Sequence, residues 1–87
     1  MGTIAARHAR EILENAQLVL AIELMCACQG IDFRRLAPSP RTGAACAVIR
    51  QRVSRLDDDR ELHTDIEHIA RMVAGGTLRR VAMDWCT

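Results

Sequence analysis

Histidine is one of the two residue types in this chain that most often bind metals or transfer protons in proteins. His8 follows Arg7 on what we expect to be the solvated half of a long helix. His63 and His68 are five positions apart, a spacing that does not stack two side chains on one helical face. No cysteine or carboxylate completes a zinc-binding spacing around them. We therefore expect exposed or capping histidines, with no catalytic residue and no metal ligand among them.

Cysteine is the other such residue type, and the chain contains Cys26, Cys28, Cys46 and Cys86. No secretory segment precedes them, so a disulfide framework is not the expected arrangement. Cys26 and Cys28 lie two positions apart on a predicted helix and point to different faces, which prevents them from chelating one metal ion. The pattern favours buried or idle thiols.

Glu23 is the most informative single residue, because it is the only polar residue in the run Leu18–Cys28. A buried carboxylate must be paired, hydrogen-bonded or protonated. We expect a salt bridge from Glu23 to an arginine of a neighbouring helix. The alternative is a carboxylate that lines a functional site.

The other sequence patterns that could indicate a catalytic or binding site are weak. The acidic run Asp57–Asp59, followed by Arg60, is typical of a solvated loop, since a cation site would need further oxygen ligands that the sequence does not supply. The sequence contains no nucleophile elbow, no P-loop and no dinucleotide-binding glycine motif. We predict no catalytic, cofactor-binding or metal-binding residue in this chain.

The charges of the chain are nearly balanced. Its 12 basic residues, all arginine, and 11 acidic residues leave a net charge of +1. That balance provides no electrostatic footprint for nucleic acid or for an anionic membrane, and we expect neither as a partner. Codon bias in a GC-rich genome explains the absence of lysine at least as well as a functional requirement for arginine does.

The element that must position these residues is one long helix, predicted over residues 3–29 with Thr3 as its N-cap and Gly30 as its stop. Its first half is amphipathic. The run Leu18–Cys28 is apolar on every side, so it must be surrounded by other structure. The run is shorter than the roughly 20 residues that a membrane span needs. It is therefore predicted to lie in the core of a helical bundle.

The length of this helix exceeds what a small domain can cover. At 1.5 Å per residue it is about 40 Å long, whereas a compact chain of this size has a radius of gyration of about 12 Å. The remaining segments are too short to surround the apolar half. The chain therefore needs partners, which are either the rest of a longer polypeptide or further copies of itself.

Shorter helices are predicted to follow. Residues 31–42 form a linker with Pro38 and Pro40, and a second helix runs from Arg41 or Thr42 to Leu56. Thr64 and Glu67 form a capping box that opens a third helix. Gly75 and Gly76 end that helix, and a short fourth helix runs from Thr77 to about Met83. The predicted fold is all-α, with a long bundle helix over 1–30 and a small helical subdomain over 31–87, as part of a larger bundle.

Three segments in order carry a family resemblance. They are Met1-Gly2-Thr3-Ile4-Ala5-Ala6-Arg7; Glu14-Asn15 with Leu20-Ala21-Ile22-Glu23-Leu24 and Ala27-Cys28-Gln29-Gly30-Ile31-Asp32-Phe33-Arg34; and Leu56-Asp57 through Asp59-Arg60 with Asp65-Ile66-Glu67. This ordered set resembles the C-terminal part of histidine ammonia-lyases, beginning just after the active-site loop. Phenylalanine and tyrosine ammonia-lyases share the helix but fit the tail less well.

The resemblance implies a parent enzyme that converts L-histidine to urocanate and ammonia, in histidine catabolism. Enzymes of this family use a methylidene-imidazolone ring, formed autocatalytically from an internal Ala-Ser-Gly, and a tyrosine base. They are cytoplasmic homotetramers built on a bundle of long helices, with active sites formed by loops of several subunits.

This chain departs from the family in lacking both Ala-Ser-Gly and tyrosine. No catalytic position of the family can be placed on its residues, so the chain alone is expected to be inactive and to hold no cofactor. Met1 would be internal in the full-length family, which is consistent with a split gene, a fragmentary gene prediction or a truncated product. The alternative function is a standalone helical module that self-associates through Leu18–Cys28. A nucleic-acid-binding role is disfavoured by the balanced charge.

Overall fold

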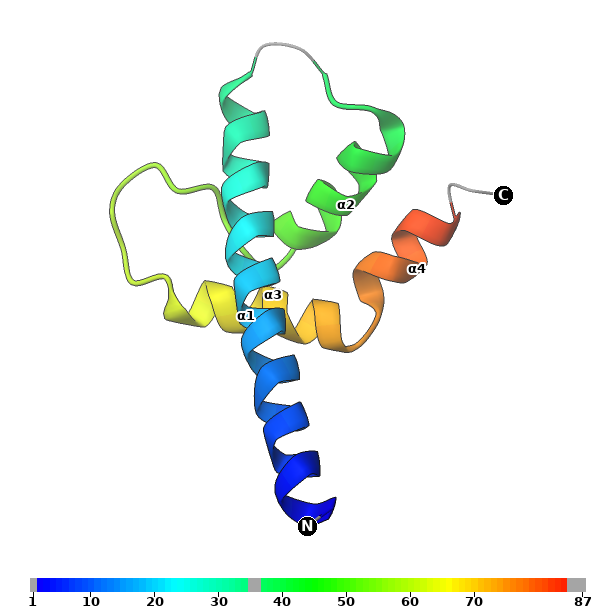
Figure 1. Ribbon diagram of the computed structural model, residues 1–87. Coiled ribbons are helices and arrows are strands. Elements are labelled where there is room, and N and C mark those ends of the chain that lie inside the picture. The colour runs from blue at the N-terminus through cyan, green and yellow to red at the C-terminus, as the bar shows by residue number, and fades with distance from the viewer. Residues whose placement is uncertain (1, 35–36, 85–87) are drawn as a thin grey trace.

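The structure is a computed structural model that describes residues 2–34 and 37–84. Within those ranges the chain forms helices and no strand, so the predicted all-α class is confirmed. The helices are α1 (Gly2–Phe33), α2 (Pro40–Arg50), α3 (His63–Ala74) and α4 (Thr77–Asp84), as Figure 1 shows. Cys86, one of the four cysteines considered above, lies outside the described residues.

The long helix α1 is longer at both ends than the sequence predicts. It begins at Gly2, so Thr3 lies within its first turn and is not its N-cap. It continues through Gly30 to Phe33, and the predicted stop at Gly30 is therefore wrong. Contacts beyond the glycine hold this last turn in place: the Asp32 carboxylate pairs with Arg50, and the Arg55 guanidinium carbon lies 5.4 Å from the centroid of the Phe33 ring. These tertiary contacts outweigh the modest helix-breaking tendency of one glycine.

Helix α2 begins close to its predicted start but ends early. Ser39 is its N-cap, since the Thr42 N–H donates to Ser39 Oγ at 3.4 Å, and Pro40 occupies the first turn. The helix ends at Arg50, so the prediction that it reaches Leu56 is wrong. The backbone of Leu56 instead bonds to the Gln29 side chain of α1, which accepts from the Leu56 N–H and donates to its carbonyl. A distant side chain thus satisfies backbone groups that a longer helix would have paired internally.

Helix α3 does not use the predicted capping box. It begins at His63 with Leu62 at the N-cap position, and no side chain caps it. Thr64 lies inside the first turn, where its hydroxyl is 3.4 Å from His63 Nε2. The helix ends at Gly75, and Gly76 adopts a left-handed conformation with φ of 76°. Helix α4 follows at Thr77, as predicted, and ends one residue beyond Met83.

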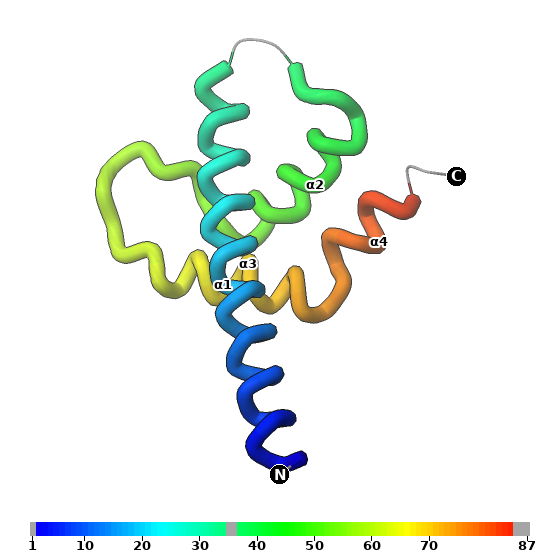
Figure 2. Tube along the Cα trace, in the orientation of Figure 1, coloured from blue at the N-terminus to red at the C-terminus, as the bar shows by residue number. Residues whose placement is uncertain are grey.

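The helices make a thin, open arrangement around α1 (Figure 2). Helix α3 crosses α1, α2 lies beside its C-terminal half, and the N-terminal half of α1 projects away from the rest. One small core, made by Ala21, Cys28, Ile49, Val53 and Ile69, joins α1 and α3 to α2 and the turn after it. The radius of gyration is 15.0 Å, against about 12 Å for a compact chain of this length. The prediction that the long helix would protrude from the rest of the chain is confirmed.

Candidate assembly interface

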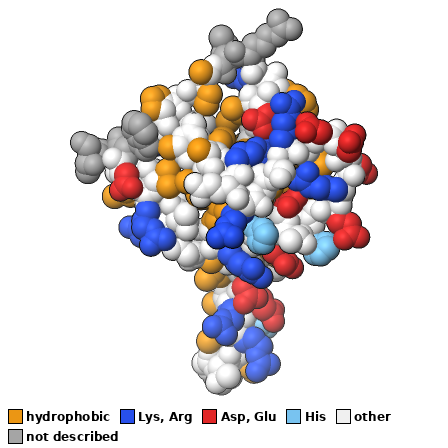
Figure 3. All heavy atoms as spheres, turned by 180° about the vertical axis from the view of Figure 1, so that it is seen from behind, with side chains coloured by type: hydrophobic (Ala, Val, Ile, Leu, Met, Phe, Trp, Pro, Cys, Tyr) orange, Lys and Arg blue, Asp and Glu red, His pale blue; other side chains and the backbone are white. Residues whose placement is uncertain are grey.

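Large apolar side chains along α1 are exposed to solvent. We define the uncovered α1 segment by its members, which are 40% to 69% exposed: Ile4, Ile12, Leu13, Leu18, Val19, Leu20 and Ile22. Every residue from 2 to 16 is exposed, and Ala21 and Cys28 are the buried residues of this helix. Figure 3 shows apolar side chains reaching down the projecting part of the helix beside its charged residues. The other helices therefore leave most of the apolar run uncovered, as its length predicts.

Exposure on this scale has a measurable cost. Fully burying one leucine or isoleucine side chain stabilises a protein by about 1.5–3 kcal/mol. Single apolar residues on a surface are ordinary, but seven large ones exposed on one helix indicate an interface with protein or lipid. The uncovered α1 segment is therefore the strongest candidate for a functional surface in the described part of the chain.

Helix α1 also meets a simple test for a membrane span. The run Leu18–Cys28 is too short to cross a bilayer by itself, but the complete helix Gly2–Phe33 contains an 18-residue window that is long and apolar enough. Core helices of soluble proteins meet the same criterion. One such helix is therefore weak support for a membrane location.

Glu23 lies on an exposed side of α1, next to a hollow formed with α3 and α4. Arg79 of α4 lines the same hollow, together with the apolar side chains of Leu20, Val73 and Leu78. Among the described residues no arginine forms an ion pair with Glu23. The predicted salt bridge is therefore wrong for residues 2–34 and 37–84, among which the exposed Glu23 forms no ion pair.

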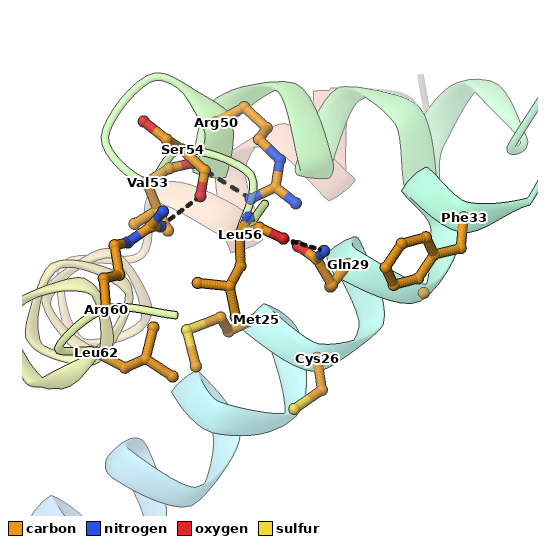
Figure 4. A pocket seen from close by; sticks show the side chains of 11 residues that line it. Met25, Cys26, Gln29, Phe33, Arg50, Val53, Ser54, Leu56, Arg60 and Leu62 are labelled. Atoms are coloured by element: carbon orange, nitrogen blue, oxygen red, sulfur yellow. Dashed lines mark hydrogen bonds between the residues drawn. The ribbon is translucent and has the colours of Figure 1, made fainter. Parts of the chain in front are cut away.

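A cleft of about 330 Å³ lies between the C-terminal half of α1 and the loop after α2 (Figure 4). Most of its lining is apolar, with Met25, Phe33, Leu56 and Leu62 among its walls. Two hydrogen bonds of 2.9 and 3.1 Å between Gln29 and the Leu56 backbone span the cleft (Figure 4).

The two arginines that line this cleft have structural partners. Arg50 pairs with Asp32, and Arg60 pairs with Asp65 and also donates to the Ser54 and Arg55 carbonyls. The cleft brings together no nucleophile and base within hydrogen-bond reach among the described residues. The hydrogen bonds across it hold the loop after α2 against α1.

The three histidines differ in their exposure to solvent and in their contacts. His8 and His63 are exposed, as predicted, and His63 Nδ1 is 3.8 Å from the Glu61 carboxylate. His68 is half-buried, and its Nδ1 has no hydrogen-bond partner, so the expectation of exposure is wrong at this position. Among residues 2–34 and 37–84, no three side chains of His, Cys, Asp or Glu gather at metal-binding distance.

The acidic loop is exposed along Asp57–Asp59, as the sequence predicts. Asp57 pairs with Arg55 at 3.3 Å on the surface. Arg60 turns back to Asp65 at 3.0 Å and anchors the loop to the first turn of α3. The run is thus a solvated connection between α2 and α3.

The cysteines include one contact that the sequence does not predict. Cys26 is exposed and Cys28 is buried, which confirms that they point to different faces. The Cys28 thiol lies 3.0 Å from Cys46 Sγ, to which it donates a hydrogen bond. Burial, and then the hydrogen bond to Cys46, raises the pKa of Cys28 to about 12. The spacing of 18 residues carried no signal for this pair, because only the packing of α2 on α1 brings the two thiols together.

Comparison with known proteins identifies the family. The family model described as aromatic amino acid lyase matches residues 1–51, which include all of α1 and α2. The chain belongs to the aromatic amino acid lyase family. The uncovered α1 segment lies inside the matched region. Its exposed apolar residues therefore belong to the part of the sequence that matches the family.

The similar members of the aromatic amino acid lyase family are named histidine ammonia-lyases. The chain is 52% identical over 81 residues to the one from Symbiobacterium thermophilum and 47% identical over 79 residues to the one from Natranaerobius thermophilus. It is 42% identical over 82 residues to the one from Caldanaerobacter subterraneus. These matches cover 90% to 93% of this chain but only 16% of each relative's length. No solved structure matches.

Proposed function

We propose that this chain is a structural segment of a histidine ammonia-lyase, and that its function is to supply α1 to a larger helical assembly. The uncovered α1 segment carries this proposal, because seven large apolar side chains on one helix require a protein surface to pack against. The 42% to 52% identity to histidine ammonia-lyases supports the identity of that assembly. The same likeness supports a cytoplasmic homotetramer as the complete form.

The chemistry of that enzyme would reside outside this chain. The prosthetic ring of the family requires an Ala-Ser-Gly sequence, and the base requires a tyrosine; the sequence contains neither. The residues present therefore do not fit the ring, and the proposed contribution of this chain to ammonia elimination is assembly.

Complementation tests the proposal directly. The histidine ammonia-lyase of Symbiobacterium thermophilum would be expressed without the segment that matches this chain, alone and together with this chain. We expect the two polypeptides to copurify, and urocanate absorbance to appear only when both are present. Copurification without urocanate, from a pair in which the ring has formed, would refute the enzymatic role.

The alternative function is a helical module that associates with copies of itself through the same exposed segment, which the identity to histidine ammonia-lyases does not favour. Size-exclusion chromatography with light scattering on the isolated chain separates the two. A discrete oligomer supports the module, whereas a monomer or heterogeneous aggregates support a segment that lacks its partner. Flotation with lipid vesicles would instead indicate that α1 binds a membrane.

A further inference from the structure

Two thiols from different helices are in contact at the small core of the chain. Cys28 of α1 and Cys46 of α2 have their sulfur atoms 3.0 Å apart. A disulfide bond is about 2.05 Å long, so closure requires the sulfur atoms to approach by only about 1 Å. No aromatic amino acid lyase chemistry uses these residues, since the chain holds none of the family's catalytic sequence.

We propose that Cys28 and Cys46 are a redox-modification site, at which a small-molecule disulfide oxidises the pair to a disulfide that fastens α2 to α1. The described attachments of α2 to α1 are otherwise few. They are the Asp32–Arg50 ion pair and the packing of Ile49 in the shared core. A covalent link would therefore change how firmly α2 holds the C-terminal half of α1.

The difference in exposure between the two thiols sets the order of the reaction. Cys46 is half-buried and Cys28 is 3% exposed, so the oxidant meets Cys46 first. The Cys46 thiolate attacks one sulfur of the small disulfide, whose S–S bond breaks, and one small thiolate leaves. Cys28 then gives its proton to solvent, and its thiolate attacks the Cys46 sulfur and expels the second small thiolate. Two protein thiols are oxidised, and one small disulfide is reduced to two thiols.

The electrostatic environment makes the second step the slower one. Burial and the hydrogen bond to Cys46 hold the pKa of Cys28 near 12, so little of it is thiolate at neutral pH. Part of this rise comes from the negative charge of a Cys46 thiolate, and that part disappears once Cys46 carries the mixed disulfide. The Arg50 guanidinium acts in the opposite direction and stabilises the Cys28 thiolate. Ring closure is thus expected to accelerate with pH.

The geometry selects this pair over the other cysteine pairings. Cys26 is exposed on a different face of α1 and has no described contact with Cys46. A chain without fixed packing would instead form mixed pairings among its four cysteines. Which two cysteines form the crosslink therefore shows whether the fold brings Cys28 and Cys46 together.

Peptide mapping of the full chain after incubation with oxidised glutathione tests the proposal. Cleavage after arginine separates residues 11–34, which contain Cys26 and Cys28, from residues 42–50, which contain Cys46. We expect the main crosslink to join these two peptides in the native chain and to become a minority product in denaturant. The oxidised chain should melt about 10 °C higher than the reduced chain.

Matched serine variants identify the cysteine that is used. Cys26→Ser should keep the crosslink and the rise in melting temperature, whereas Cys28→Ser and Cys46→Ser should lose both. Mixed pairings in the native chain, or a crosslink that disappears in Cys26→Ser but persists in Cys28→Ser, would overturn the proposal. The same mapping on the complemented lyase shows whether the pair also reacts within the assembly, independently of urocanate formation.

Discussion

Gln29 shows how one side chain organises a segment far away in sequence. Its amide nitrogen donates to the Leu56 carbonyl at 2.9 Å, and its amide oxygen accepts from the Leu56 N–H at 3.1 Å. These two bonds tie the long loop between α2 and α3 to α1. No other described residue pairs with both backbone groups of one loop residue in this way.

Replacing Gln29 with Ala should therefore destabilise the chain by about 1–3 kcal/mol, because it leaves partly buried backbone groups unpaired. Urea denaturation followed by circular dichroism measures the change. Gln17→Ala removes the same side chain elsewhere on α1, where it forms no described hydrogen bond, and serves as the control. Equal effects of the two substitutions would contradict the role of the Gln29 bonds.

The stability of the chain at alkaline pH tests the contribution of a second single residue, Cys28. The sequence has no lysine and no tyrosine, so neither of these side chains adds to the pH dependence of stability above pH 9. Burial raises the pKa of Cys28 from 9.0 to about 12, which means that the folded chain retains a proton that the unfolded chain releases. The stabilisation that protonated Cys28 contributes is therefore fully present below pH 9, and it is lost as pH rises toward 12.

Melting temperatures across this pH range, under reducing conditions, measure that loss. The wild-type chain and Cys26→Ser should lose stability together, while Cys28→Ser should show a much flatter profile. A steep decline that persists in Cys28→Ser would mean that another group causes the pH dependence.

At the scale of the helices, two glycines have opposite effects on the stability of the chain. Gly30 lies within α1, where an added Cβ meets nothing within 4 Å. Gly76 adopts φ of 76° between α3 and α4, a conformation that residues with a side chain rarely adopt. Their surroundings are equally open, so the difference between them is one of backbone conformation alone.

Gly30→Ala should therefore stabilise the chain by about 0.5–1 kcal/mol, and Gly76→Ala should destabilise it by about 1–2 kcal/mol. The free energy of unfolding in urea measures both, and each variant is the control for the other. A loss of stability in Gly30→Ala would show that α1 needs the glycine at this position.

At the scale of the whole molecule, α1 determines the shape. The chain extends 53 Å along its longest axis and only 17 Å along its shortest, so most of its apolar helix has no second layer over it. A stable single domain buries its apolar faces between at least two layers of structure. The open shape is the expected state of a segment whose second layer belongs to other polypeptide.

Polar substitution of the uncovered α1 segment tests this view. Leu18→Gln with Ile22→Gln should leave the melting of the isolated chain nearly unchanged, since both side chains are 40% or more exposed. The same pair should weaken complementation of the lyase at least about tenfold, because two apolar contacts are lost. Titrating urocanate formation against chain concentration measures this effect.

The control pair is Arg10→Gln with Glu14→Gln, two exposed charged residues in the N-terminal half of the same helix. It should change complementation by less than about twofold, because exposed charged side chains contribute little to stability or binding. Equal losses in both double variants would mean that the exposed apolar residues are not the interface.

Local sequence determined the helices of this protein. Apolar periodicity, Ser39 with Pro40, and the glycine pair Gly75–Gly76 act within a few residues, so the all-α class, the start of α2 and the α3–α4 turn could be predicted. The excess length of the apolar helix also follows from the sequence, because helix rise and chain length are enough to show that it cannot be covered.

Tertiary structure alone decided the contacts between helices. The end of α1 at Phe33 and the early end of α2 differ from local signals, because Asp32 and Gln29 bind groups 18 and 27 residues away in sequence. Cys28 and Cys46 meet for the same reason. The sequence predicted that Cys26 and Cys28 point to different faces of one helix, which the structure confirms. Only the packing of α2 against α1 placed these two thiols in contact, because that packing depends on side chains from three separate segments.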